Sequence, residues 1–292
     1  MIAALRSFLF APADNAKVLE KAHLRGADAL ILDLEDAVAP AAKAAARQGL
    51  AAQVARLSGH GLPVLVRINS AWRDVAADLE AAVLPGVTAL VAPKVEEGGA
   101  VRVLAAMIGE WEAERGLPAG AIGLIALIES PAALERLAAI ADSPRLVGLA
   151  LGSEDFSLAL GVEPAEAALA LPCRQIALAA AARSLAAIGL PGSLAEFRDL
   201  EAYGASVRHA RAVGMTGVLC IHPDQVTVVN REFSPSEAEQ AWAREVIAAW
   251  NGAQQTGLGA IAVRGRMVDR PVAERARAIL ARAASYTGEP LK

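Results

Sequence analysis

The chain has few cysteines and few aromatic residues, and it has no long apolar run. Cys173 and Cys220 are its two cysteines among 292 residues, which excludes a disulfide framework and predicts two buried, small hydrophobic side chains in a reducing compartment. No stretch offers the roughly 20 consecutive apolar residues of a membrane helix, and Met1–Arg6 leads into a strand-like run without a signal-peptide region. We therefore expect a cytoplasmic protein that does not enter a membrane.

The chain also has no large excess of charge of one sign. The 28 Lys and Arg residues and 32 Asp and Glu residues give a net charge of −4. The longest basic stretch is Arg264-Gly265-Arg266, whereas a nucleic-acid-binding protein needs a basic stripe, so we expect no nucleic-acid partner. With 55% hydrophobic and 21% charged residues the chain is not disordered, and 4% aromatic residues indicate an aliphatic, Ala-rich core.

Short apolar runs alternate with helical stretches along the chain. Runs buried on both faces are predicted at Ser7–Pro12, Ala29–Leu34, Val64–Asn69, Ala89–Val95, Ile122–Glu129, Leu146–Gly152 and Gly217–Pro223, with a weaker one near Leu190–Phe197. Long helices are predicted at Gln175–Ala187 and Glu237–Trp250, and Pro40 and Pro131 suit the first turn of a helix. Eight strand–helix repeats predict a parallel (β/α)8 TIM barrel. No Gly-x-Gly-x-x-Gly follows the first strand, which counts against a dinucleotide-binding fold.

The end of the chain differs in composition from the repeats. We expect a barrel over residues 1–250 and a separate segment over residues 251–292. Asn251–Gly259 has the composition of a flexible linker, and it precedes an extended run at Ile261–Val268 and a helix opening at Pro271. Because this segment lies beyond the eighth repeat, we interpret it as a lid, a cap or an arm that swaps onto a neighbouring subunit.

Polar residues end most of the apolar runs. In a TIM barrel the active site lies at these carboxyl ends. The residues are Asp33, Glu35 and Asp36 after the second strand, Arg67 and Asn69 after the third, Lys94 and Glu96 after the fourth, Glu129 after the fifth, Ser153, Glu154 and Asp155 after the sixth, and His222 after the eighth. Several carboxylates side by side need a counter-charge. One or two carboxylates with substrate and water oxygens suit Mg²⁺.

Glu129 and Asp155 are the first choice as metal ligands, because they end adjacent strands. Arg67 has the planar fork that grips a substrate carboxylate. The small residues Gly152 and Ser153 let backbone N–H groups approach an anion or a carbonyl oxygen.

A structural role is the alternative for most of these residues. Glu129 and Asp155 stand where a helix begins and favour its dipole or cap it. Arg67 pairs with Glu35 or Asp36 in that interpretation, and Asp33 is a satisfied carboxylate inside the barrel. Lys94 neutralises Glu96, and His222 orients the turn after the eighth strand.

Taken together, these strings resemble the citrate lyase β-subunit-like branch of the HpcH/HpaI aldolase superfamily. The matching pieces are Arg6-Ser7-Phe8-Leu9-Phe10-Ala11-Pro12, Leu32-Asp33-Leu34-Glu35-Asp36-Ala37-Val38, Arg67-Ile68-Asn69, Pro93-Lys94-Val95, Ile128-Glu129-Ser130-Pro131, Gly152-Ser153-Glu154-Asp155-Phe156, Ile221-His222-Pro223-Asp224-Gln225-Val226 and Gly265-Arg266-Met267-Val268-Asp269. They run in order along nearly the whole chain. Two loops, Ala13-Asp14-Asn15 and Pro191–Glu196, depart from the usual family residues, so the acyl group is not fixed.

The resemblance implies a Mg²⁺-dependent lyase that cleaves or forms a carbon–carbon bond in a coenzyme A (CoA) thioester such as citryl-, malyl- or citramalyl-CoA. It assigns the metal to Glu129 and Asp155, the keto acid to Arg67 and to the backbone around Ser153–Asp155, and the orientation of Arg67 and metal-bound water to Glu35 and Asp36. It also implies a homotrimer or hexamer in which Asp269 enters the neighbouring subunit's site as the catalytic acid or base.

Three other functions stay open from the sequence. The same site suits a CoA thioesterase, in which water attacks the thioester. The chain also suits a non-catalytic subunit of a larger lyase complex. A CoA-independent aldolase acting on 4-hydroxy-2-keto acids is the third possibility, and there the extended tail would have little to do.

Overall fold

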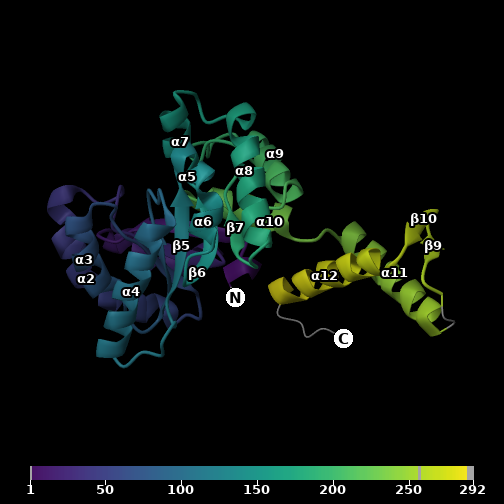
Figure 1. Ribbon diagram of the computed structural model, residues 1–292, viewed down its shortest axis with the longest axis horizontal. Helices are drawn as coiled ribbons and strands as arrows, with labels where there is room; N and C mark the ends of the chain where they lie inside the picture. Colours follow the sequence, from purple (N-terminus) through teal and green to yellow (C-terminus); the bar gives the residue numbers. More distant parts are fainter. Residues whose placement is uncertain (1, 256–257, 288–292) are drawn as a thin grey trace. The chain divides into compact units, whose positions relative to one another are not determined.

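Eight parallel strands form a nearly closed barrel with helices between them (Figure 1). The computed structural model describes residues 2–255 and 258–287. The strands pair in the order β7-β6-β5-β4-β3-β2-β1-β8, and an isolated bridge between Ile188 and Gly217 joins the two edges. The predicted (β/α)8 TIM barrel is therefore confirmed.

The strands are β1 (Ser7–Pro12), β2 (Ala29–Asp33), β3 (Val64–Arg67), β4 (Val87–Ala92), β5 (Gly123–Ile128), β6 (Leu146–Leu151), β7 (Ala186–Ile188) and β8 (Val218–Cys220). The helices of the barrel are α1 (Ala16–Glu20), α2 (Lys43–Ser58), α3 (Trp72–Ala82), α4 (Gly98–Glu114), α5 (Pro131–Glu135), α6 (Leu137–Ala141), α7 (Ser153–Leu160), α8 (Glu166–Ala181), α9 (Leu200–Ala212) and α10 (Pro223–Phe233). Short 3₁₀ turns lie at Ile2–Ala4, Ala22–Arg25 and Pro40–Ala42. Pro40 and Pro131 begin their helical segments, as predicted.

Alternate residues of each strand face two different cores. Those facing inward fill the barrel with mostly aliphatic side chains: Phe8, Ala29, Ile31, Leu65, Ala89, Val91, Ile125, Leu127, Ala150, Ala186, Ile188 and Leu219. Their neighbours pack outward against the helices in the larger core. Cys173 and Cys220 are buried and free, as expected. The next inward position beyond each strand end therefore faces the mouth of the barrel.

The seventh repeat departs from the prediction. The weak strand expected near Leu190–Phe197 is wrong, because the strand is Ala186–Ile188 and a loop follows it. The helix expected over Gln175–Ala187 ends at Ala181 instead. The sequence is Ala-rich on both sides of this break, so hydrophobic periodicity does not mark it. The chain turns at Ser184, whose φ of 56° lies in the left-handed region.

The chain divides after Phe233 into two compact units. The expected boundary at residue 250 falls inside α11 (Glu237–Gln255), which also includes the first five residues of the predicted linker Asn251–Gly259. Residues 256 and 257 of that linker lie outside the described residues. The helix continues into the predicted linker, because Ala253, Gln254 and Gln255 have high helix propensity.

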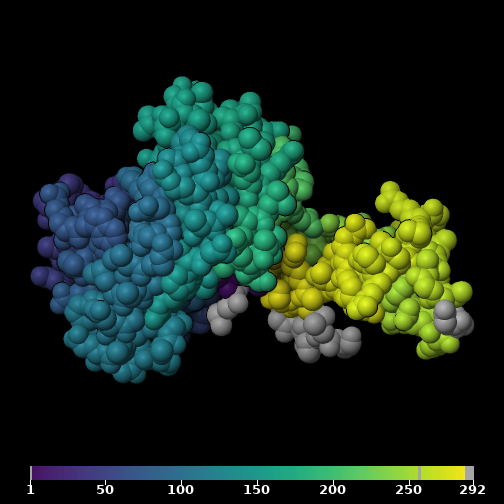
Figure 2. All heavy atoms as spheres, in the orientation of Figure 1, coloured from purple at the N-terminus to yellow at the C-terminus, as the bar shows by residue number. Residues whose placement is uncertain are grey.

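The second unit has a small core of its own. Antiparallel strands β9 (Ile261–Val263) and β10 (Arg266–Val268) form a hairpin, followed by α12 (Arg270–Thr287). Its buried residues are Ala243, Val246, Trp250, Val263, Val268, Ala273 and Ala276, and the atoms of the unit pack closely together (Figure 2). In the basic stretch Arg264-Gly265-Arg266, Arg264 and Gly265 form the hairpin turn with φ of 49° and 72°, and Arg266 begins β10. Among the helices described, none is long and apolar enough to cross a membrane.

Candidate active site

Side chains alternate between the two faces of a strand, and this alternation brings predicted polar residues to the mouth of the barrel. Asp33, Arg67 and Glu129 continue the inward positions of β2, β3 and β5, as Phe10 does in β1. They line one cavity of about 420 Å³. Its other polar residues are Asp36, Ser153, Glu154 and Asp155, and Gly152, Leu194 and Ala195 complete much of its wall. The candidate metal ligands and the candidate substrate arginine thus share one cavity.

Arg67 is held in a fixed orientation by Asp33. Its Nε and Nη2 atoms donate to the two Asp33 carboxylate oxygens at 2.7 and 2.6 Å. Asp33 also accepts hydrogen bonds from the backbone N–H groups of Glu35 and Ala37 at 2.9 and 3.1 Å. Burial lowers the pKa of Arg67, but its hydrogen bonds and charge interaction with Asp33 outweigh this and raise that pKa above its ordinary value. The guanidinium is therefore a permanent, oriented positive charge.

The remaining Arg67 nitrogen faces two more carboxylates. Nη1 lies 3.0 Å from Glu35 Oε2 and 3.5 Å from Asp36 Oδ2. The Lys94 ammonium lies 3.5 Å from Glu35 Oε1, so it neutralises Glu35 and not Glu96. Burial raises the pKa of Glu35, against the opposing charge of Arg67. Sequence reasoning named Glu35 and Asp36 as the partners of Arg67 and did not pair it with Asp33. Spacing from Ile31 gives the inward position of Asp33, but the pairing with Arg67 comes from the register of β2 and β3.

Glu129 is a buried carboxylate with one backbone donor. Its Oε2 accepts a hydrogen bond from the Lys94 N–H at 2.5 Å, and the side chain is 7% exposed. Burial raises the pKa of Glu129 to about 7, and the nearby charges of Asp155 and Glu35 act in the same direction. Lys94 reaches this position with a left-handed φ of 52°. Such backbone strain outside glycine is typical of functional sites.

Gly152 leaves the space that Glu129 occupies. A Cβ atom at Gly152 would lie 2.5 Å from Glu129 Oε1 and 2.9 Å from its Cδ. Gly152 also precedes α7 without capping it through a side chain. The absence of a side chain at this inward position of β6 therefore decides where the Glu129 carboxylate lies.

The start of α7 faces the same cavity. Ser153 is buried, and its Oγ has no hydrogen-bond partner within the described part of the chain. The first backbone N–H groups of a helix are available to an anion. The Glu154 carboxylate binds the loop after β7, because its Oε1 accepts from Ser193 Oγ at 2.7 Å and from the Leu194 N–H at 2.9 Å. These bonds fix that loop as one wall of the cavity.

The capping alternatives for Glu129 and Asp155 do not match the geometry. Ser130 caps α5, with its Oγ accepting from the Ala133 N–H at 3.1 Å. Gly152 occupies the N-cap position of α7, so Asp155 lies inside its first turn. His222 does lie in the turn after β8, stacked on Phe197 at 5.1 Å between ring centroids. Neither carboxylate therefore caps a helix through its side chain.

The donor set at the mouth fits a hard divalent cation. Over residues 2–255 and 258–287, no group of three or more His, Cys, Asp and Glu side chains is arranged to hold a metal. Two carboxylates, Glu129 and Asp155, interact electrostatically within one cavity. Mg²⁺ usually takes one or two protein carboxylates and keeps water or substrate oxygens for its other positions.

Asp269 belongs to the second unit. It directly follows β10, and its Oδ1 accepts a hydrogen bond from the Val272 N–H at 3.2 Å, so it caps α12. This places a carboxylate at the base of the hairpin.

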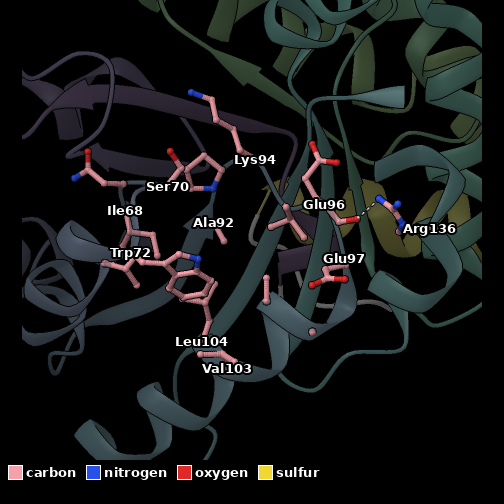
Figure 3. A pocket seen from close by; sticks show the side chains of 16 residues that line it. Ile68, Ser70, Trp72, Ala92, Lys94, Glu96, Glu97, Val103, Leu104 and Arg136 are labelled. Atoms are coloured by element: carbon pink, nitrogen blue, oxygen red, sulfur yellow. Dashed lines mark hydrogen bonds between the residues drawn. The ribbon is translucent and has the colours of Figure 1, made fainter. Parts of the chain in front are cut away.

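A larger cavity of about 640 Å³ lies beside the ends of β3 and β4 (Figure 3). Trp72, Val103 and Leu104 line its apolar side, and Arg136 donates to the Glu96 carbonyl at 3.5 Å on the other. Among the polar residues expected at the strand ends, Asn69, Lys94 and Glu96 line it, but Arg67, Glu129 and Asp155 do not. The candidate metal ligands and the candidate substrate arginine thus belong to the smaller cavity.

Comparisons with known proteins agree on one family. The model of the family HpcH/HpaI aldolase/citrate lyase matches residues 6–223. A citrate lyase subunit beta-like protein of Deinococcus radiodurans is 34% identical over 95% of this chain and 97% of its own length. A (3S)-malyl-CoA thioesterase of Cereibacter sphaeroides is 34% identical over 95% of this chain and 94% of its own. The crystal structure of protein CitE of Mycobacterium tuberculosis, in complex with magnesium, acetoacetate and coenzyme A, has a TM-score of 0.75 and 34% identity, covering 97% of this chain and 99% of that one.

Proposed function

Because this chain belongs to the HpcH/HpaI aldolase/citrate lyase family, we propose that it is a Mg²⁺-dependent carbon–carbon lyase. Its substrate class is a β-hydroxyacyl thioester of coenzyme A, such as citryl-, malyl- or citramalyl-CoA. The products, or the substrates of the reverse reaction, are a keto acid and an acyl-CoA. The observation that carries this proposal is the common cavity of Glu129, Asp155 and Arg67. Magnesium, acetoacetate and coenzyme A in the similar CitE crystal structure support it.

Glu129 and Asp155 would hold the cation. When bound, Mg²⁺ supplies Lewis-acid stabilisation for the substrate oxygen that gains negative charge. Gly152 and the Lys94 N–H keep the Glu129 carboxylate in place for this role. Two protein carboxylates leave coordination positions for the hydroxyl and carboxylate oxygens of the substrate.

Arg67 acts on the bond-breaking step. As the carbon–carbon bond breaks, the hydroxyl gives its proton to water and becomes the keto oxygen, while the bonding electrons move onto the thioester fragment and form its enolate. The Arg67 guanidinium, fixed by Asp33, places positive charge beside the oxygen that bears the negative charge. The free N–H groups at the start of α7, around Ser153, hold the substrate carboxylate.

A proton donor completes the cleavage. The thioester enolate must gain a proton at its carbon, and the Asp269 carboxylic acid of a neighbouring copy is our candidate. In the reverse direction the Asp269 carboxylate removes that proton. This role needs the second unit to cover another copy's cavity as a lid, and it implies an oligomer, a homotrimer or hexamer.

Thioester hydrolysis is a second candidate function. A relative that is 34% identical has the name (3S)-malyl-CoA thioesterase, which favours it. In that reaction the same cation and Arg67 would polarise the thioester carbonyl while water attacks. The products would then be free CoA and the β-hydroxy acid, with no keto acid.

One assay separates these functions. The purified chain is incubated with Mg²⁺ and a panel of citryl-, malyl- and citramalyl-CoA, and free thiol and keto acid are followed together. Keto acid with acyl-CoA and no free thiol supports the lyase. Free thiol without keto acid supports the thioesterase. No product from any thioester contradicts both, and it favours a non-catalytic subunit of a lyase complex.

A further inference from the structure

Every polar group of the Asn69 side chain, next to the cavity that contains Arg67, makes a hydrogen bond. Its Nδ2 donates to Asp78 Oδ2 at 2.7 Å and to the Leu34 carbonyl at 3.1 Å. Its Oδ1 accepts from the Lys43 ammonium. Its own backbone N–H donates to Asp78 Oδ2 at 2.6 Å. Asn69 is 3% exposed, so these bonds hold it in a single orientation away from water.

Asp78 ties Asn69 to two helices. Asp78, on α3, is fully buried, and its Oδ1 accepts from Arg47 Nε on α2 at 2.6 Å. Arg47 also pairs with Asp74 on α3 at 3.0 Å. The half-buried Arg47 guanidinium therefore neutralises the buried Asp78 carboxylate, and both oxygens of Asp78 have donors.

The bond to Leu34 connects this network with the arginine site. Leu34 lies between Asp33 and Glu35, the two carboxylates closest to the Arg67 guanidinium. Its N–H donates to the Arg67 carbonyl at 3.0 Å, and its carbonyl accepts from Asn69. Without Asn69, the turn after Asp33 would lose the side-chain bond that fixes it on the side away from the cavity.

We propose that Asn69, held by Asp78 and Arg47, is a positioning residue that sets the place of the Arg67 guanidinium through Leu34. Asn69 lines the larger neighbouring cavity and not the one that contains Arg67, so its connection to Arg67 runs through Leu34. The inference rests on the proposed lyase function, in which Arg67 stabilises charge during bond cleavage. Misplacement of such a group by about 1 Å costs up to roughly a hundredfold in rate.

The test substitutes Asn69→Ala, which removes the side-chain bonds to Leu34, Asp78 and Lys43. It keeps the backbone bond from residue 69 to Asp78 and the Arg47–Asp78 ion pair. Asp74→Asn is the matched control, because it weakens the same network at Arg47 but contacts neither Asn69 nor Leu34. We expect N69A to lower kcat about tenfold or more, with an unchanged Kd for Mg²⁺, and D74N to keep kcat within about twofold.

A double-mutant cycle with Arg67→Lys separates positioning from general stability. If Asn69 acts through Arg67, N69A costs less than about twofold in kcat in the R67K background. An equal loss in both backgrounds would overturn the inference, since a structural defect does not depend on residue 67. A loss of Mg²⁺ affinity in N69A would overturn it too.

Hydrogen exchange provides a readout that needs no activity. In N69A the amides of Leu34, Glu35 and Ala37, which donate to Arg67 and Asp33, are expected to exchange faster by about tenfold, while those of β5 and β6 stay as in the wild type. If N69A is active and these exchange rates are unchanged, the positioning role is contradicted but the proposed lyase function is not. A wild-type chain that cleaves no thioester contradicts the proposed function, whatever the exchange shows.

Discussion

The Cα of Gly152 and the carboxylate of Glu129 face each other so closely that a Cβ at residue 152 would lie 2.5 Å from Glu129 Oε1. The two residues follow neighbouring strands, β6 and β5, at inward positions. A glycine on one strand thus decides where a buried carboxylate on the next strand lies. This relationship ties the position of the candidate metal ligand to the smallest side chain of the site.

Gly152→Ala should therefore move Glu129 and weaken Mg²⁺ binding. We expect the Kd for Mg²⁺, measured by isothermal titration calorimetry, to rise about tenfold or more, because a displaced ligand costs metal affinity on that scale. Gly49→Ala is the control, since a Cβ there meets nothing within 4 Å and the residue lies within α2. If G152A binds Mg²⁺ like the wild type, Glu129 is not held by this contact.

Magnesium binding should depend on pH through Glu129. Its folded-state pKa of about 7 exceeds the ordinary 4.5, so the metal-free fold retains a proton there between these values. Mg²⁺ must displace that proton, and its apparent affinity should fall about tenfold from pH 8 to pH 6. Calorimetry in two buffers of different ionisation enthalpy should detect about one proton released per Mg²⁺ near pH 6. A Kd independent of pH would contradict the combination of a raised pKa and a ligand role for Glu129.

The same shift affects the stability of the metal-free protein. A raised folded-state pKa contributes stability that is present below pH 4.5 and is lost as the pH rises through 7. Glu129→Gln removes this titration. The thermal midpoint of the wild type relative to E129Q should therefore fall between pH 5 and pH 8 without Mg²⁺. A constant difference between the two midpoints would contradict the raised pKa.

Much of this site could be predicted from the sequence, because the spacing of residues along a strand decides which side chains face the barrel interior. The end of each apolar run indicated Arg67, Glu129 and Asp155, and the structure places all three around one cavity. Asp33 was read as a satisfied carboxylate, and its identity as the main partner of Arg67 depends on a pairing between strands that spacing does not fix. The Asn69–Asp78 bond, across nine residues and a helix start, depends likewise on how α3 packs.

Ser153 offers a test of the cavity wall. Its buried Oγ lacks a partner among the described residues and lines the cavity, whereas Ser157 Oγ, one turn later on α7, is equally buried and lacks a partner but does not line it. We expect Ser153→Ala to raise KM for the thioester about tenfold or more, since a hydrogen bond to a charged group contributes about 1.5–3 kcal/mol. Ser157→Ala should leave KM unchanged. Equal effects of the two substitutions would indicate a role in helix packing only.

Asp269 carries the most specific prediction about chemistry. Asn caps helices about as well as Asp, so Asp269→Asn should leave α12 intact while it removes an ionisable group. If the carboxylic acid of residue 269 protonates the thioester enolate, kcat should fall by about a hundredfold or more. The Kd for Mg²⁺ should not change, because Glu129 and Asp155 hold the cation. Turnover of D269N at the wild-type rate would remove Asp269 from the mechanism, and it would leave the second unit without a chemical role in the lyase.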